Sequence, residues 1–144
     1  MLTHYADDFR TTVFRQTMFA EFEMITHEKN GKKGDSLTPQ ELSQIYYDLN
    51  LQYHGKEMTV DKDIEMEWAR IPHFYTSFYV YKYATGFSAA TSFSKQILEE
   101  GQPAVDRYLG FLSSGGSDYS LNILKKSRCR YVQSGAYQAG DERV

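Results

Sequence analysis

Residues 37–50, LTPQELSQIYYDLN, contain the clearest helix start in the chain. Thr38 is a suitable N-cap, Pro39 takes the first helical position, and Glu41 completes a capping box three residues after the threonine. Gly55 provides a stop signal at the other end. Between these limits the apolar residues recur at the three- and four-residue spacing of one helical face, at Leu42, Ile45, Tyr46, Leu49 and Tyr53. The stretch therefore predicts an amphipathic helix between Thr38 and Gly55.

Helical signals continue on both sides of this stretch. We expect a long helix before it, at about residues 3–30, and four more after it, at residues 61–69, 74–100, 103–112 and from Ser117 through Leu124. No strand alternation persists, so the predicted fold class is all-α with about six helices. Residues 128–144 show no period, no cap and little to bury. We therefore expect a helical segment over residues 1–127 and an irregular tail over 128–144.

The composition favours a soluble cytoplasmic protein of one domain. The chain has 144 residues, 41% of them hydrophobic, and a net charge of −3, which supplies no basic surface for nucleic acid or an anionic membrane. No apolar run approaches the roughly 18–20 residues that cross a bilayer, and the acidic start is unlike a signal peptide. Cys129 is the single cysteine, which excludes a disulfide framework and a multi-cysteine zinc site.

Motifs for metal binding and nucleophilic catalysis are missing from the sequence. No two histidines are four residues apart, as two ligands on one helical face would be. His27 and Glu28 begin like an HExxH zinc motif, but Gly31 takes the place of the second histidine. There is also no glycine-rich phosphate loop and no GxSxG elbow. We therefore expect no metal site formed by this chain.

Polar-tipped aromatic residues crowd residues 70–83, RIPHFYTSFYVYKY. The chain has 12 Tyr, 9 Phe and 1 Trp, which is a large share to bury in a short protein. On the expected helix, Tyr75, Tyr79 and Tyr83 are four apart and would form one ridge. These rings either pack in a core, or they line a cleft in which His73 and protonated tyrosine hydroxyls donate hydrogen bonds to a developing oxyanion. Spacing alone leaves both interpretations open.

Specific strings in the chain resemble the C-terminal part of the oligoendopeptidase F family, a family of zinc metallopeptidases that cut short peptides. The resemblance covers about residues 4–126 in unbroken order. The strings that carry it are FRTTVFRQTMFAEFE (9–23), LTPQELSQIYYDLN (37–50), EWARIPHFYTSFYVYKYATGFSAA (67–90) and YLGFLSSGGSDYSLNILKK (108–126). The resemblance implies an antiparallel helical segment of a larger helical peptidase fold that carries the thermolysin-type zinc motif.

The resemblance places the zinc ligands elsewhere. The family's HExxH helix and its third-ligand glutamate precede the region that this chain resembles, so zinc belongs to the complete enzyme and not to this chain alone. None of Glu21, Glu23 or Glu28 is expected to be a replacement ligand; their expected role is a solvated helix charge or helix pairing. The ending over residues 128–144 also departs from the family, and we expect it to derive from a shifted reading frame or a junction.

The resemblance implies that this chain supplies the half of the substrate cleft that lies opposite the zinc. Similar peptidases use a histidine and one or two tyrosines there, and His73 and Tyr79 match that catalytic role best. The alternates for substrate binding are Tyr75, Tyr81 and Tyr83. Gly86 suggests close approach by substrate or by another helix, since glycine inside a helix costs about 1 kcal/mol relative to alanine.

The expected function is the C-terminal part of a zinc metallo-oligoendopeptidase that hydrolyses short peptides, inactive on its own because it lacks the zinc ligands and the general base. Two alternatives belong to other classes. One is a helical interaction module that docks on a partner through its aromatic helix, for example a separately encoded N-terminal half of the peptidase. The other is an inactive remnant that self-associates through its rings.

Overall fold

The computed structural model describes residues 2–33 and 36–129, and these contain helices and no strand. The predicted all-α class is confirmed, with six α-helices in the described ranges. The chain divides into two compact units, Met1–Ala84 and Thr85–Val144. Residues 130–144, which make up most of the predicted tail, lie outside the described residues. No helix in the described ranges combines the length and apolar character needed to cross a bilayer.

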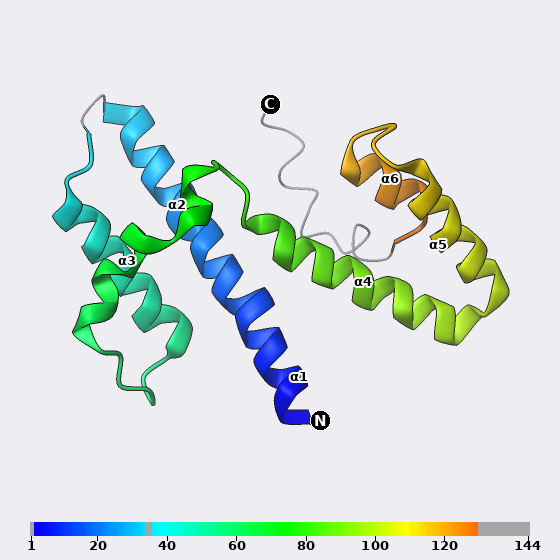
Figure 1. Cartoon of the computed structure of the whole chain (residues 1–144), viewed down its shortest axis with the longest axis horizontal. Helices are drawn as coiled ribbons and strands as arrows, with labels where there is room; N and C mark the ends of the chain where they lie inside the picture. Colours follow the sequence, from blue (N-terminus) through cyan, green and yellow to red (C-terminus); the bar gives the residue numbers. More distant parts are fainter. Residues whose placement is uncertain (1, 34–35, 130–144) are drawn as a thin grey trace. The chain divides into compact units, whose positions relative to one another are not determined.

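The first unit begins with a nearly continuous helical rod (Figure 1). Helix α1 (Leu2–Phe9) leads into a π-helical turn, η1 (Arg10–Phe14), and then into α2 (Arg15–Lys33). The long first helix expected at about residues 3–30 is therefore confirmed, with one wider turn in its course. Residues at three- and four-residue spacing on α2 turn one face toward the core.

Helix α3 (Pro39–His54) forms as the capping box predicts. The Thr38 hydroxyl accepts from the Glu41 backbone N–H at 3.3 Å, and the Glu41 carboxylate accepts from the Thr38 backbone N–H at 2.9 Å. The helix ends at Gly55, whose φ of 76° is a left-handed conformation that glycine adopts without strain. Both ends of this helix therefore follow from local sequence.

The helix expected at residues 61–69 is a 3-10 helix, η2 (Lys62–Arg70), followed by a second short one, η3 (Pro72–Tyr75). Three residues per turn align Ile64, Glu67 and Arg70 on one face. Ile64 packs on the core, and the buried Glu67 accepts a hydrogen bond from Arg70 at 2.5 Å. The core contact of Ile64 and the local Glu67–Arg70 pair both fit the three-residue repeat of this tighter helix.

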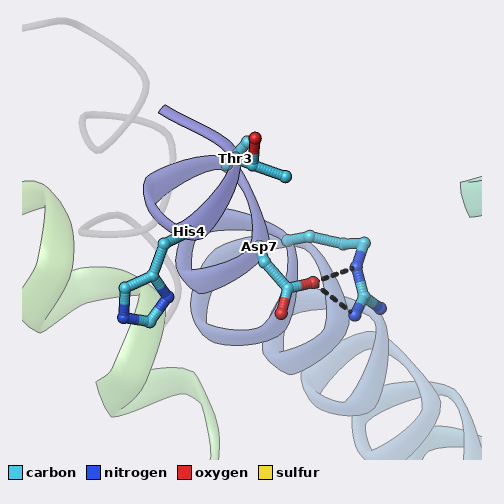
Figure 2. A pocket seen from close by; sticks show the side chains of 5 residues that line it. Thr3, His4 and Asp7 are labelled. Carbon is cyan, nitrogen blue, oxygen red and sulfur yellow. Dashed lines mark hydrogen bonds and ion pairs between the residues drawn. The ribbon is translucent and has the colours of Figure 1, made fainter. Parts of the chain in front are cut away.

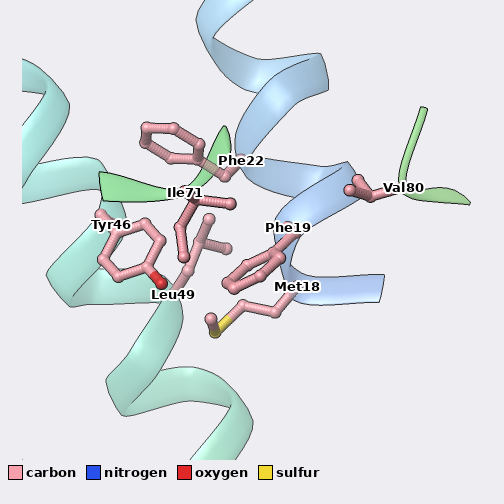
Figure 3. Packing of buried hydrophobic residues seen from close by; sticks show 7 residues of the cluster. All are labelled: Met18, Phe19, Phe22, Tyr46, Leu49, Ile71 and Val80. Atoms are coloured by element: carbon pink, nitrogen blue, oxygen red, sulfur yellow. The ribbon is translucent and has the colours of Figure 1, made fainter. Parts of the chain in front are cut away.

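The core of the first unit lies between α2, α3 and the chain that follows η2 (Figure 3). Figure 3 shows side chains from all three converging, and each is at most 7% exposed: Met18, Phe19, Phe22, Tyr46, Leu49, Ile71 and Val80. Burial of each large apolar side chain contributes about 1.5–3 kcal/mol. This core fixes the two ends of the segment that carries the candidate site, at Ile71 and at Val80.

In the second unit, α5 (Gln102–Ser114) and α6 (Ser120–Lys126) follow the long helix α4 (Tyr81–Glu100). Its small core consists of Ala89, Phe93 and Cys129, with Tyr108, Phe111 and Leu124 packed against them. The helix start expected at Ser117 is wrong, because α6 begins only at Ser120. Asp118 organises this start instead, since its carboxylate accepts from the Tyr119 backbone N–H, the Asn122 amide and the Lys126 ammonium.

The C-terminal end of α6 is closed by a Schellman motif at the first residues of the predicted tail. Arg128 is left-handed, with φ 54°, and its N–H donates to the Lys125 carbonyl at 3.0 Å. The Cys129 N–H donates to the Leu124 carbonyl at 3.1 Å, and the two side chains pack in the same core. Arg128 and Cys129 are therefore ordered parts of the helix end.

Candidate functional site

The candidate residues lie where η3 passes into α4, and the predicted helix over residues 74–100 is wrong there. Helix α4 starts only at Tyr81, and the residues between Tyr75 and Tyr81 are not helical. Phe78, in the middle, has a φ of 55°. A residue with a bulky side chain pays about 1–3 kcal/mol to adopt this left-handed backbone conformation, which interrupts a right-handed helix. The predicted ridge of Tyr75, Tyr79 and Tyr83 therefore does not exist as a helical face.

Three of the predicted residues nevertheless come together. The Tyr83 hydroxyl lies 3.3 Å from His73 Nε2, which is hydrogen-bond distance. The ring of His73 lies 5.6 Å from that of Tyr79 and 5.9 Å from that of Tyr83, and the two tyrosine rings are 5.8 Å apart. We call His73, Tyr79 and Tyr83 the His–Tyr cluster. It draws one member from η3, one from the irregular segment and one from α4.

The electrostatics of the His–Tyr cluster favour hydrogen-bond donation. A side-chain hydrogen bond with Tyr79 raises the pKa of Tyr83, so this phenol stays protonated at neutral pH. The Lys82 ammonium lies 4.2 Å from the centre of the Tyr79 ring and places a positive charge beside the cluster. His73 offers a ring nitrogen that donates or accepts according to its tautomer. The cluster is therefore suited to binding an electron-rich oxygen.

The other predicted site residues are not part of the cluster. Tyr75 is 85% exposed, and Tyr81 is exposed on the first turn of α4. A Cβ built at Gly86 would meet no atom of the described residues within 4 Å, so no packed helix accounts for that glycine. A role of these three residues in substrate binding stays a prediction.

Two acidic residues of α2, Glu21 and Glu23, act as hydrogen-bond acceptors inside the first unit. Glu21 accepts from the Tyr53 hydroxyl at 2.6 Å, and burial, together with this hydrogen bond, raises the pKa of Tyr53 to about 12. Glu23 is 4% exposed and accepts from the Phe78 backbone N–H. Within the described part of the chain, no three His, Cys, Asp or Glu side chains are grouped so that they could hold a metal ion. The predicted helix-pairing role fits Glu21 and Glu23 better than that of solvated charges.

A second polar cluster, which sequence reasoning missed, surrounds Glu67. Its carboxylate accepts from Arg15 at 2.6 Å, from Arg70 at 2.5 Å and from the Tyr46 hydroxyl at 2.6 Å. Burial alone would raise the pKa of Glu67, but the hydrogen bonds from Arg15 and Tyr46 outweigh it and lower the pKa. Burial, together with the hydrogen bond to the same carboxylate, raises the pKa of Tyr46. The Glu67 carboxylate is thus satisfied by two guanidinium groups and one hydroxyl, which indicates a structural role.

A surface hollow on α1 and the first residue of η1 contains none of the predicted site residues (Figure 2). Figure 2 shows Asp7 turned toward the guanidinium of Arg10, which it binds at 2.8 and 3.1 Å. The remaining lining residues are Thr3, His4 and Ala6, all exposed. This exposed ion pair is therefore not an alternative to the His–Tyr cluster.

Comparisons with known proteins match nearly the whole chain. A family model described as Peptidase family M3 matches residues 1–142. Oligopeptidase PepF of Bacillus subtilis is 57% identical over 127 residues, which is 88% of this chain and 19% of that protein. Group B oligopeptidase PepB of Streptococcus agalactiae is 43% identical over 127 residues, with 88% of this chain and 21% of that protein covered.

A solved structure has a similar fold. The crystal structure of oligoendopeptidase-F from Enterococcus faecium matches 99% of this chain with a TM-score of 0.81 and 42% identity, and 28% of that chain is covered. This chain spans about a fifth of the length of the curated relatives that it matches.

Proposed function

The chain belongs to peptidase family M3, and from this premise we propose that its His–Tyr cluster forms part of the substrate cleft of a metallo-oligoendopeptidase that hydrolyses short peptides. The observation that supports the proposal is the convergence of His73, Tyr79 and Tyr83 within 6 Å of one another, ring centre to ring centre. A convergent set of neutral donors is what a peptide carbonyl oxygen requires as it gains negative charge.

Within this cleft, Tyr79 and His73 act as donors to the scissile carbonyl oxygen, and Tyr83 orients His73. The Tyr79 O–H and a protonated ring nitrogen of His73 each donate to the oxygen. The Tyr83 hydroxyl lies at hydrogen-bond distance from His73 Nε2 and orients the ring. Removal of one such donor typically lowers kcat by about 10²–10³-fold. Tyr75, Tyr81 and Gly86 are the candidates for contacts with the rest of the peptide.

Zinc, which the family resemblance implies, does not fit the described residues of this chain, since they offer no group of three metal-binding side chains. We propose that zinc is bound in the complete peptidase by residues outside those described here, and we assign no step to it. The chain by itself then supplies hydrogen-bond donors and contacts for the peptide substrate but has no hydrolytic activity. The single cysteine, Cys129, suits the reducing cytoplasm that we propose as its location.

A chimera tests the proposal. This chain would replace the matching segment of Bacillus subtilis PepF, and cleavage of a quenched fluorescent peptide would be measured for the chimera and for the isolated chain. We expect cleavage by the chimera only, and a decrease in its kcat of about 10²–10³-fold for His73→Ala and for Tyr79→Phe. Tyr119→Phe is the control, because that side chain is 83% exposed and belongs to the second unit.

Two results would contradict this proposal. Chelator-sensitive cleavage by the isolated chain would show that it carries its own metal site. Full activity of the His73→Ala chimera would show that the His–Tyr cluster is not part of the substrate cleft.

A second candidate function is a helical module that docks on a partner. Exposed apolar side chains at the start of the chain favour it, and among them Leu2 is 87% and Phe14 50% exposed. Light scattering of the isolated chain tests the case in which the partner is a second copy of the chain. A monodisperse monomer would count against self-association through the exposed rings.

A further inference from the structure

The turn that brings Tyr79 beside His73 has an unfavourable backbone conformation at its centre. Phe78 has a φ of 55°, and left-handed backbone is rare for a bulky side chain. A non-glycine residue keeps this conformation only when its surroundings hold it there. Tyr79 follows directly, so the direction in which the Tyr79 ring leaves the chain depends on the backbone of Phe78.

Glu23 on α2 supplies the holding contact. Glu23 is 4% exposed, and its carboxylate accepts a hydrogen bond from the Phe78 backbone N–H. Among the described residues, no basic side chain forms an ion pair with Glu23. A carboxylate buried without such a partner is stabilised by the backbone donor that faces it. The contact joins residues 55 positions apart in the sequence.

Other contacts fix the two ends of the turn, where the backbone N–H of Thr76 donates to the His73 carbonyl at 3.0 Å and that of Tyr83 to the Val80 carbonyl at 3.2 Å. The His27 ring lies 4.6 Å from the Phe78 ring, and its Nδ1 is 2.7 Å from the Glu23 carbonyl oxygen. Phe74 packs against Phe19 and Phe22, at 5.3 and 5.2 Å between ring centres, and Val80 is fully buried. The turn is therefore anchored on both sides, and the Glu23 contact selects the conformation between the two anchors.

We propose that Glu23 is a positioning residue for the His–Tyr cluster, because its carboxylate holds the backbone of Phe78 in the left-handed conformation that places Tyr79 and Tyr83 against His73. This inference rests on the proposed function for its catalytic meaning. The claim that Glu23 positions the three rings concerns the isolated chain, and it is tested on the isolated chain. Without the carboxylate, Phe78 returns to a negative φ and the Tyr79 ring leaves His73.

The test is NMR of the full chain, with Glu23→Gln and Glu23→Ala as variants. We expect the nuclear Overhauser contacts between the rings of His73, Tyr79 and Tyr83 to be weakened in Glu23→Gln, whose amide oxygen still accepts, and lost in Glu23→Ala. The pH titration of Tyr83 should move down toward the ordinary tyrosine value in the same order, because its pKa is raised by the hydrogen bond with Tyr79.

Glu21→Gln is the matched control. Glu21 lies two positions earlier on α2 and also accepts a hydrogen bond, from Tyr53, but it does not contact the turn. We expect this variant to keep the ring contacts and the Tyr83 titration. Phe78→Gly in the Glu23→Gln background should restore both, because glycine adopts positive φ without a holding contact. The double variant also covers the case in which Glu23→Ala does not fold.

The possible outcomes separate this inference from the proposed function. Unchanged ring contacts in folded Glu23→Gln and Glu23→Ala, or equal losses in Glu21→Gln, would overturn the positioning role of Glu23. If the contacts are lost in Glu23→Ala while the same substitution leaves the kcat of the PepF chimera unchanged, the positioning role stands and the catalytic role of the cluster fails.

Discussion

At the scale of single residues, the buried carboxylate of Glu67 accepts hydrogen bonds from three side chains. It binds Arg15 from α2, Tyr46 from α3 and Arg70 from its own helix, so one side chain joins three elements. A buried carboxylate is tolerated only when donors replace the water that it loses. No local pattern indicates the contacts with Arg15 and Tyr46, which are 52 and 21 positions away, whereas the pairing with Arg70 is local, at a separation of 3.

Replacement of Glu67 by glutamine should destabilise the chain by about 2–3 kcal/mol, since it leaves Arg15 without its counter-charge. The loss stays at the low end because the Arg70 side chain is 73% exposed and can turn to water. Urea unfolding, followed by circular dichroism, measures it. Glu65→Gln is the control, because the Lys62–Glu65 pair is partly exposed and should contribute at most about 1 kcal/mol. Equal losses for the two variants would contradict the prediction.

The contribution of Glu67 should also depend on pH. Its pKa in the folded state is below the ordinary value of 4.5, so the stabilisation is complete above that pH and is lost as the pH falls through the lower, folded-state pKa. We expect the difference in unfolding free energy between the wild type and Glu67→Gln to be constant from pH 7 to 5 and to shrink below about pH 4.5. If the difference in unfolding free energy grows on acidification instead, the pKa of Glu67 is not lowered by folding.

At the scale of elements, helices whose ends are marked by neighbouring residues could be predicted, and those that depend on distant contacts could not. Helix α3 follows from Thr38, Glu41 and Gly55, all within or beside it. Helix α4 starts later than predicted because Phe78 takes a conformation that no local pattern indicates. The candidate site was likewise predictable only in part. The residue types of His73, Tyr79 and Tyr83 suggested the chemistry, but the predicted ridge was wrong and only the fold brings the three rings together.

The capping box of α3 should be worth about 1 kcal/mol. We expect Thr38→Ala to lower the unfolding free energy by that amount, because the backbone N–H of Glu41 loses its acceptor. Chemical denaturation measures the change, with Ser36→Ala, two residues before the cap, as a control that should have almost no effect. A loss below about 0.3 kcal/mol for Thr38→Ala would indicate that Pro39 alone is sufficient to start the helix.

At the scale of the whole molecule, the described chain has two separate hydrophobic cores. The core of the first unit joins α2, α3 and the segment that leads to the His–Tyr cluster. The core of the second unit is smaller and is completed by the residues that close α6. Membership of peptidase family M3 rests on nearly the whole chain, whereas the chain covers about a fifth of its curated relatives. The activity proposed above therefore concerns a larger protein than the residues described here.

Because Cys129 is buried, the reactivity of its thiol can be used to measure how often the second unit opens. The thiol is fully buried beside Phe93 and Leu124, and the chain has no other cysteine. An alkylating reagent can reach it only when α6 and its closing residues detach, so the labelling rate gives the equilibrium between closed and open forms. We expect a single mass increment that appears slowly in native buffer and at the rate of a free thiol in denaturant. Rapid labelling under native conditions would mean that this end of the molecule opens far more often than its packing indicates.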